Sequence, residues 1–325
     1  MELNEKDVQI QAQQFIDYSS KFKVSNISEL FLSWCESKGF DGKAEQAIYN
    51  KVKVLIEQEK RCETHPDARV DTSKRHLSFT QINMFLRCGR QYEYRYVQGI
   101  KRPPSGALIL GKSWHMAVEH NYKQKIQTEQ DLPLEDVQDC FSDAFDQAFT
   151  EEVELNEGEN PGQLKDTGIL VTATHHKIIA PTVQPAEVEK EFNLSLGEEF
   201  PFFIKGFWDV IDKNGIIADN KSYSKSPAQS DVDKDLQLTL YSTAYRAIYQ
   251  KIEPELRLDC IIKTKTPKAV QISSTRTNED CKWFLGLVEK VAQAIESGVF
   301  YPNPNHYLCS PKWCGYYSRC HERNK

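Results

Sequence analysis

The spacing of apolar residues changes once along this chain, near residue 185, and this change limits the folds that it can adopt. Before it, apolar residues recur every three or four positions, as in amphipathic helices, and the predicted helices cover 107–125, 134–152 and 164–180. After it, alternating segments predict three strands joined by short turns, at 187–196, 202–211 and 215–218. A helix, two strands and a helix follow, at 232–250, 256–263, 270–274 and 278–297. This order predicts a mixed α/β domain with a central sheet.

The first 60 residues also have helical spacing but carry no chemical signal. Two apolar series, Ile27–Trp34 and Ala47–Leu55, are separated by Gly39 and Gly42. The polar stretch 61–74 contains a proline and has no periodicity, so it is interpreted as a linker. We expect residues 1–70 to form a small helical region of unknown role and residues 71–325 to form the functional domain.

The overall composition is that of a globular protein with a real core. Hydrophobic residues make up 39% and charged residues 27% of the 325 residues, which excludes a disordered chain, a collagen-like repeat and a membrane bundle. No window approaches the roughly 18 uncharged apolar residues of a membrane-spanning helix. The polar, acidic start at Met1–Lys6 does not resemble a signal peptide, so we expect a cytoplasmic location.

The charges are unevenly distributed. A net charge of −6 argues against a protein that coats nucleic acid non-specifically. Between Lys74 and Arg102, however, there are seven Lys or Arg residues and one acid, Glu93. Arginines and tyrosines alternate between residues 87 and 96, which suits a channel for a nucleic-acid strand. A helix with buried tyrosines and solvated arginines explains the same pattern equally well.

Two aspartates near the predicted strand turn are candidate metal ligands. Asp209 lies at the end of one predicted strand and Asp219 just past the next, so pairing of the strands would bring the carboxylates together. Neighbouring carboxylates repel unless a cation lies between them, and hard oxygen ligands favour Mg²⁺ or Mn²⁺. Lys221 points to the same side of an extended strand as Asp219. There it could orient a water and neutralise charge on a phosphate, although Asp-x-Lys is also common at solvated strand ends.

The chain resembles the RecB-like branch of the PD-(D/E)XK nuclease superfamily over roughly residues 77–322. The resemblance is carried by an ordered series, Gly206-x-x-Asp209, Asp219-x-Lys221 and Gln237-x-x-x-Tyr241. Upstream, Gly111-Lys-Ser-Trp-His115 is similar to a helical motif that ends in a metal-binding histidine. The segment from Leu77 to Cys88, followed by Gln91–Tyr96, is similar to the family's opening helix and starts with a capping box at Ser78–Gln81. The sequence departs from many members in having Asp rather than Glu at position 219.

The resemblance implies a restriction-endonuclease-like core and a role for each matched residue. Asp209 and Asp219 would be metal ligands, together with His115 and the backbone carbonyl of Asn220. Lys221 would position the hydrolytic water. Gln237 and Tyr241, one helical turn apart, would hold the site and the DNA backbone.

Structural explanations exist for several of these residues. His115 could be a core histidine, and Gln237 and Tyr241 could be packing residues. Glu187, Glu189 and Glu191 alternate along one strand; one of them could join the metal site, but a solvated strand edge is the simpler interpretation. No role is assigned to His175 and His176.

Nine cysteines, an odd number, argue against a disulfide framework in a chain that begins without an export signal. Five are isolated and interpreted as packing residues, Cys35, Cys62, Cys140, Cys260 and Cys281. Three crowd together near the C-terminus, Cys309, Cys314 and Cys320, at spacings wider than those usual for structural zinc. AddB-type and CRISPR-adaptation nucleases place one cysteine before the core and three after it, around a [4Fe–4S] cluster. That resemblance implies Cys88 as the fourth ligand; zinc, with His306 or His321 substituting, and free thiols are the alternatives.

These features lead to one main hypothesis and two alternatives. The main hypothesis is a Mg²⁺- or Mn²⁺-dependent DNA nuclease with a [4Fe–4S] cluster, in which the resemblance favours exonuclease action on DNA ends or single strands. The first alternative is a non-catalytic module that binds DNA ends or a helicase, with no membrane partner. The second is a zinc- or cluster-stabilised adaptor. Repair, recombination, phage replication, CRISPR adaptation and antiviral defence remain open as pathways.

Overall fold

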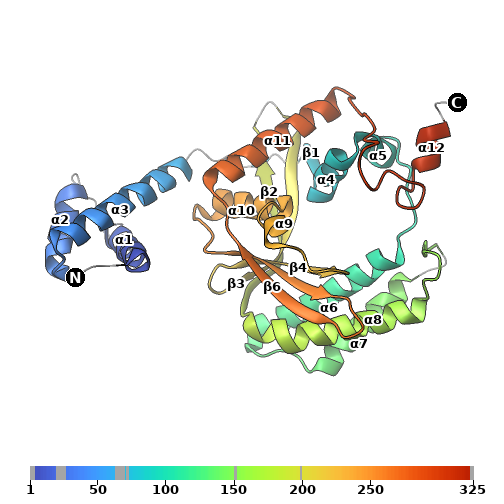
Figure 1. The fold of residues 1–325 in the computed structure, drawn as a ribbon, viewed down its shortest axis with the longest axis horizontal. Helices are drawn as coiled ribbons and strands as arrows, with labels where there is room; N and C mark the ends of the chain where they lie inside the picture. Colours follow the sequence, from blue (N-terminus) through green and yellow to red (C-terminus); the bar gives the residue numbers. More distant parts are fainter. Residues whose placement is uncertain are drawn as a thin grey trace. The chain divides into compact units, whose positions relative to one another are not determined.

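In a computed structural model, the chain divides into two compact units, Met1–His65 and Pro66–Lys325 (Figure 1). The structure describes residues 4–19, 27–62, 70, 73–149, 152–197 and 200–322. The predicted linker at 61–74 lies largely outside these ranges, and the predicted domain boundary at residue 70 stays a prediction. Within the described residues, no helix is both long and apolar enough to cross a membrane.

The first unit is a small bundle of helices. Its helices are α1 (Glu5–Ser19), α2 (Ile27–Lys38) and α3 (Gly42–Cys62). Their apolar faces meet in a core that includes Phe15, Phe31 and Trp34, with the rings of Phe15 and Phe31 packed edge to face at 4.9 Å. Gly39, directly after α2, has a φ of 69°, a left-handed conformation that glycine adopts without steric cost.

The second unit is built on a mixed sheet of six strands, which confirms the predicted fold class. The strands are β1 (Arg75–Leu77), β2 (Pro185–Ser195), β3 (Phe202–Asp212), β4 (Ile217–Tyr223), β5 (Leu256–Ile262) and β6 (Lys268–Ser274). β3, β4, β5 and β6 pair in this order. β1 pairs with the same edge of β3 as β4 does, and β2 pairs with the opposite edge of β3. β1 and β5 run parallel to their neighbours β3 and β4, whereas the remaining pairs are antiparallel.

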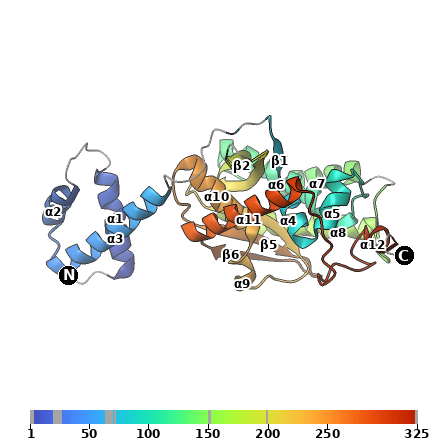
Figure 2. The same ribbon diagram turned by 90° about the horizontal axis from the view of Figure 1, so that it is seen from above.

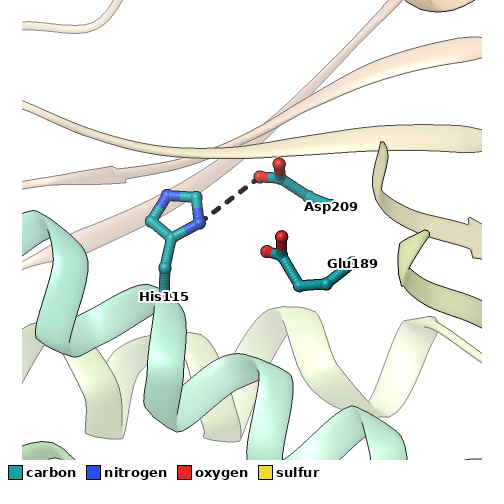
Figure 3. A group of neighbouring side chains, drawn as sticks. All are labelled: His115, Glu189 and Asp209. Carbon is teal, nitrogen blue, oxygen red and sulfur yellow. Dashed lines mark ion pairs between the residues drawn. The ribbon is translucent and has the colours of Figure 1, made fainter. Parts of the chain in front are cut away.

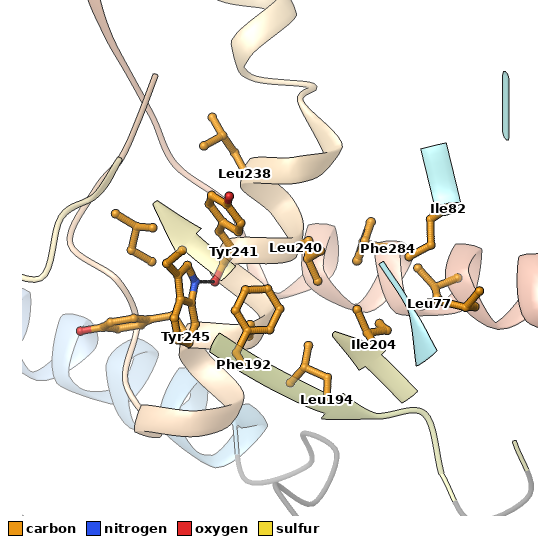
Figure 4. Packing of buried hydrophobic residues seen from close by; sticks show 14 of the residues in the cluster. Leu77, Ile82, Phe192, Leu194, Ile204, Leu238, Leu240, Tyr241, Tyr245 and Phe284 are labelled. Carbon is orange, nitrogen blue, oxygen red and sulfur yellow. Dashed lines mark hydrogen bonds between the residues drawn. The ribbon is translucent and has the colours of Figure 1, made fainter. Parts of the chain in front are cut away.

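Helices cover both faces of this sheet (Figures 1 and 2). One face packs against α6 (Gly106–Thr128), α7 (Leu134–Ala148) and α8 (Pro161–Thr174). The other packs against α4 (Phe79–Arg87), α10 (Leu236–Tyr249) and α11 (Asn278–Glu296). Figure 4 shows this second core, which includes Phe192, Leu240 and Phe284. The strands are therefore held from both sides by apolar contacts.

Short helices complete the unit. They are α5 (Gly89–Tyr92), the π-helix η1 (Glu93–Val97), the π-helix η2 (His175–Ile179), the 3₁₀-helix η3 (Ala180–Thr182), α9 (Gln229–Val232) and α12 (Tyr317–Glu322). The predicted capping box is confirmed, because the Ser78 side chain accepts from Gln81 and the Gln81 side chain accepts from the Ser78 backbone. This box fixes the start of α4.

The predicted ends of several elements are wrong. β4 continues to Tyr223, well beyond the predicted end at residue 218, and α7 ends at Ala148 rather than at residue 152. Asp209 and Asp219 accordingly lie inside β3 and β4, not at or beyond their ends. The polar run from Asp219 to Lys221 belongs to this strand, and Asp219 and Asn220 are 1% and 2% exposed rather than solvated.

One edge of β3 is shared by two strands, and a fork lies between them. β1 pairs with β3 at Phe202–Ile204, and β4 pairs with it at Val210 and Ile211. Because β2 occupies the opposite edge throughout, the segment between Ile204 and Val210 faces an opening in the sheet. Asp209 is the last residue of that segment.

Gly206 shows why a small residue is required in this segment. Phe192 on β2 is paired with Gly206, and its ring lies over the glycine. A Cβ at position 206 would collide with this ring. We predict that Gly206→Ala lowers the free energy of unfolding by about 1–3 kcal/mol, because the ring must leave its packed position. Gly286→Ala on α11 is the matched control: its Cβ would meet open space, so this change should be neutral or stabilise by up to about 1 kcal/mol. Urea denaturation of both variants measures the difference, and equal stabilities would contradict the packing argument.

Candidate active site

The two aspartates predicted from the sequence lie together at the fork. β3 and β4 are paired at Val210 with Ala218 and at Ile211 with Ile217. Asp209 precedes Val210 and Asp219 follows Ala218, so the two aspartates lie opposite each other just beyond the last pair. The Asn220 backbone N–H donates to Asp209 Oδ2 at 2.9 Å. The carboxylate thus takes the place of a backbone acceptor where the strands separate. The Asp209 side chain remains 10% exposed, whereas that of Asp219 is 2% exposed.

Lys221 extends from β4 to the same site. Its Nζ lies 2.8 Å from Asp219 Oδ2 and 3.0 Å from Asp219 Oδ1. Burial alone would lower the pKa of this ammonium, but the carboxylates of Asp219 and Asp209 more than offset burial and raise it. The Lys221 side chain is 32% exposed, so a charged group reaches the cleft beside the aspartates.

Tyr241 and Gln237 approach the aspartates from α10. Asp235 is the N-cap of this helix, and its side chain accepts from Leu238 N. Gln237 and Tyr241 then lie one turn apart on the side of the helix that faces the fork. Tyr241 Oη lies 3.2 Å from Asp209 Oδ1 and 3.3 Å from Asp219 Oδ1, and it accepts from Gln237 Nε2 at 2.9 Å. Burial and the two carboxylates raise the pKa of Tyr241 well above its usual range, so the phenol keeps the proton that it donates.

His115 reaches the site from α6, on the opposite face of the sheet. Its Nδ1 lies 3.6 Å from Asp209 Oδ2, as Figure 3 shows. Ligand atoms of His115, Asp209 and Glu189 all lie within 4.8 Å of one another. This spacing is close enough for one ion to contact all three residues.

Glu189 is the residue of the site that the sequence pattern indicated least clearly. The three alternating glutamates of β2 differ: Glu187 accepts from Tyr249 Oη, Glu191 pairs with Lys205, and Glu189 faces His115 and Asp209. Glu189 has a φ of 47°, which is a left-handed conformation that costs a non-glycine residue roughly 1–2 kcal/mol. The solvated-edge interpretation is therefore wrong for Glu189, and alternation alone could not have revealed a local turn of the backbone.

The charges at the fork suit a divalent cation. Burial, with Asp209 and Glu119 nearby, raises the pKa of Glu189 to about 8. Burial also raises the pKa of Asp219 to about 7 despite the opposing ammonium of Lys221, and Asp209 adds to the rise. Carboxyl groups this close to one another resist ionising because their charges repel. A cation between them neutralises the charges, so the carboxylates become good ligands. Oxygen ligands with one imidazole match a hard or borderline metal ion.

Asn220 contributes backbone groups to the site while its side chain points elsewhere. The residue is 2% exposed, and its side chain lies beside His175, which is itself buried. The role of its carbonyl as a metal ligand stays a prediction. His175, unassigned from the sequence, thus lies against the strand that carries Asp219 and Lys221.

The four cysteines that the resemblance singled out line one cavity in the second unit. Cys88 caps the end of α4, and Cys309, Cys314 and Cys320 come from the C-terminal segment. The two segments are also joined by hydrogen bonds, among them Gln91 Nε2 to Cys314 Sγ at 3.0 Å. Burial and the neighbouring thiols raise the pKa of Cys309. This donor set could hold a thiolate-bound metal group.

The remaining sequence interpretations can also be compared with the structure. Of the isolated cysteines, Cys35, Cys260 and Cys281 are fully buried and Cys140 is partly buried; the Cys62 side chain lies outside the described residues. In the basic segment, Tyr92 and Tyr94 are 4% and 2% exposed. Buried rings cannot stack on bases, so these two tyrosines are core residues.

The fold and the site together have the organisation of a metal-dependent nuclease. A family model described as the PD-(D/E)XK nuclease superfamily matches residues 76–321. The chain therefore belongs to the PD-(D/E)XK nuclease superfamily, whose members use divalent metals. Among curated proteins, none matches the chain.

A crystal structure of a "Putative exonuclease" from Eubacterium rectale is similar to this chain. The sequences are 14% identical, the match covers 78% of this chain and 90% of that chain, and the TM-score is 0.46.

The raised carboxyl pKa values predict how stability depends on pH without metal. The ordinary values are 3.8 for Asp219 and 4.5 for Glu189, and in the fold they rise to about 7 and about 8. The folded protein therefore binds more protons than the unfolded chain within this interval, so its stability should fall as pH rises from about 5 to 8. Thermal unfolding in EDTA measures the trend, and Mn²⁺ should reverse it.

Two glutamine variants test the origin of this trend. Glu189→Gln should flatten the pH dependence in EDTA, because the amide cannot ionise. Glu191→Gln, two residues away on the same strand, should leave the trend unchanged, because the pKa of Glu191 is lowered rather than raised by its contact with Lys205. A stability that rises with pH in EDTA would contradict the assignment.

Proposed function

We propose that the protein is a Mg²⁺- or Mn²⁺-dependent deoxyribonuclease that hydrolyses phosphodiester bonds, with exonuclease action on DNA ends or single strands. The observation that carries the proposal is the convergence of three carboxylates, one histidine and one lysine at a fork in the sheet. The family supports the reaction class. The exonuclease mode rests on the resemblance in the sequence.

We assign each residue at the fork a distinct task. The metal would be held by Asp209, Asp219, His115, Glu189 and the Asn220 carbonyl. When bound, it supplies Lewis-acid stabilisation of the charge that develops on the phosphate. Lys221 would orient the attacking water and offset negative charge next to Asp219. Tyr241 and Gln237 would keep both carboxylates in place through the Tyr241 hydroxyl and would contact the DNA backbone.

The first test removes a charge at the site without changing its shape much. Lys221→Met and Asp219→Asn should each lower cleavage by about 100-fold or more, because each removes a group that acts on the developing charge. Lys225→Ala, an exposed lysine four residues further on, should cleave like the wild type. End-labelled single- and double-stranded DNA with Mn²⁺ provides the assay, and the product ladder gives the polarity.

Two outcomes of this assay would contradict the proposal. Full activity of Lys221→Met would overturn the site assignment. No cleavage by a folded wild-type protein that binds Mn²⁺ would favour a non-catalytic module that binds DNA ends or a helicase partner. Circular dichroism of each variant separates loss of chemistry from loss of fold.

We further propose that Cys88, Cys309, Cys314 and Cys320 bind a [4Fe–4S] cluster. A zinc ion with Zn–S bonds of about 2.3 Å would hold its sulfurs about 3.8 Å apart. Within the described residues, however, no three cysteine or histidine ligand atoms of this cavity lie within 4.8 Å of one another. The spacing of Cys309, Cys314 and Cys320 along the chain, which is wider than that usual for structural zinc, favours a four-iron cluster. Unpaired thiols also fit the reducing, cytoplasmic location that we expect.

Metal analysis of anaerobically purified protein tests the cluster. The wild type should contain about four irons and four sulfides per chain. Cys88→Ser should lose most of the iron and lower the thermal stability, because the cluster would no longer join α4 to the C-terminal segment. Cys140→Ser, which changes a partly buried cysteine on α7, should keep its iron. Zinc in place of iron, or iron unaffected by Cys88→Ser, would contradict the proposal.

A further inference from the structure

Two hollows open on the two sides of the candidate metal site. The first, of about 710 Å³, lies beneath α6 and is lined by Asp209, Lys221 and Lys263 among others. The second, of about 380 Å³, lies between the start of α4 and β3 and is lined by Asp209, Lys221 and Phe207 among others. Because Asp209 and Lys221 belong to both, a ligand held at the metal site can extend into each hollow.

Lys263 is a half-buried cation in the wall of the first hollow. It follows β5, and its backbone N–H donates to Tyr223 O at 2.7 Å, which fixes it beside the end of β4. Within the part of the chain that the structure describes, its ammonium makes no ion pair or side-chain hydrogen bond. Burial lowers the pKa of Lys263. The carboxylate of Glu159 offsets part of this effect. A partly desolvated charge is unfavourable, and an anionic ligand in the hollow would compensate the remainder.

Phe207 is an exposed ring in the wall of the second hollow. It lies on β3 two residues before Asp209 and is 42% exposed, whereas the next residue, Trp208, is 1% exposed. Lys205 Nζ lies 5.7 Å from the centre of the Phe207 ring and also pairs with Glu191, which offsets part of its charge. Lys221 lines the same hollow. An exposed ring next to cations is the arrangement on which single-stranded bases stack. Bases inside a duplex are already stacked and paired, so they would first have to leave the helix.

We propose that a single DNA strand crosses the site from one hollow to the other, with a phosphate on Lys263 on one side of the cleaved bond and a base against Phe207 on the other. This inference rests on the proposed function and specifies its substrate. Lys263 and Phe207 bind and position the strand, whereas the groups at the fork act on the reacting phosphate. The two residues therefore affect binding, and they can be tested without cleavage.

Salt dependence of binding tests Lys263. The assay is fluorescence anisotropy of a labelled single strand with the full chain in Ca²⁺, which holds the strand while limiting hydrolysis. Lys263→Met keeps the length of the side chain and should weaken binding about tenfold and reduce the slope of log K against log salt by about 0.7, the value for one phosphate contact. Lys265→Met, an exposed lysine two residues away, should leave the slope unchanged. An unchanged slope in Lys263→Met would overturn the phosphate contact.

Abasic DNA tests Phe207. Phe207→Ala should weaken binding of a normal single strand roughly tenfold and leave binding of an abasic strand of the same length unchanged, because only the first offers bases to stack. Phe207→Tyr should keep wild-type affinity. Trp283→Ala, which removes an exposed ring of α11, is the matched control and should have no effect. Equal losses on normal and abasic strands, or a larger loss on duplex DNA, would overturn the base contact.

The outcomes separate this inference from the proposed function. A wild-type protein that binds single strands through both residues but cuts no DNA would contradict the nuclease and support the strand path. A protein that cuts DNA while Lys263→Met and Phe207→Ala bind normally would support the nuclease and overturn the path. Wild-type preference for duplex over single strands in Ca²⁺ would also overturn it.

Discussion

The separation of β3 from β4 beyond Val210 and Ala218 is the constraint on which the rest of the site depends. In a continuous sheet, the backbone N–H of Asn220 would bond to a strand; here it bonds to the Asp209 carboxylate. The opening also admits His115 from one face of the sheet and Tyr241 from the other. The carboxylates, the His115 imidazole and the Tyr241 phenol can therefore meet around one point only because the backbone pairing of β3 with β4 ends there.

This arrangement is unfavourable on its own and needs support from elsewhere in the fold. Glu189 has a strained φ of 47°, and the pKa values of Glu189 and Asp219 rise to about 8 and about 7 because their charges are crowded and buried. Apolar cores on both faces of the sheet keep these strands in position despite the repulsion. A bound divalent cation would relieve the repulsion, so the crowding of these carboxylates is a physical reason for the site to hold one.

The sequence predicted the order of the elements and most members of the site, but not how the backbone presents them. Asp209, Asp219, Lys221, His115 and Tyr241 were found because their types and spacing match a motif, and the structure brings them together. Glu189 was not distinguished from its neighbours, since strand alternation assumes a regular backbone and this residue departs from it. Similarly, β4 was predicted too short because its polar residues resemble a solvated end, and only the covering helices make them part of a buried strand.

The helix α4 connects the two parts of the second unit that carry chemistry. Its first residues, Ser78 to Thr80, line the hollow that contains Phe207, and its last turn leads to Cys88 in the cysteine cavity. A helix of nine residues spans about 13 Å, and it keeps its two ends at a fixed separation. The C-terminal segment also contacts this region directly, since Asn303 Nδ2 donates to Arg87 O at 3.1 Å. Any group that orders the four cysteines therefore also fixes one wall of the hollow beside Asp209, which links the stability of the cysteine cavity to the geometry of the site.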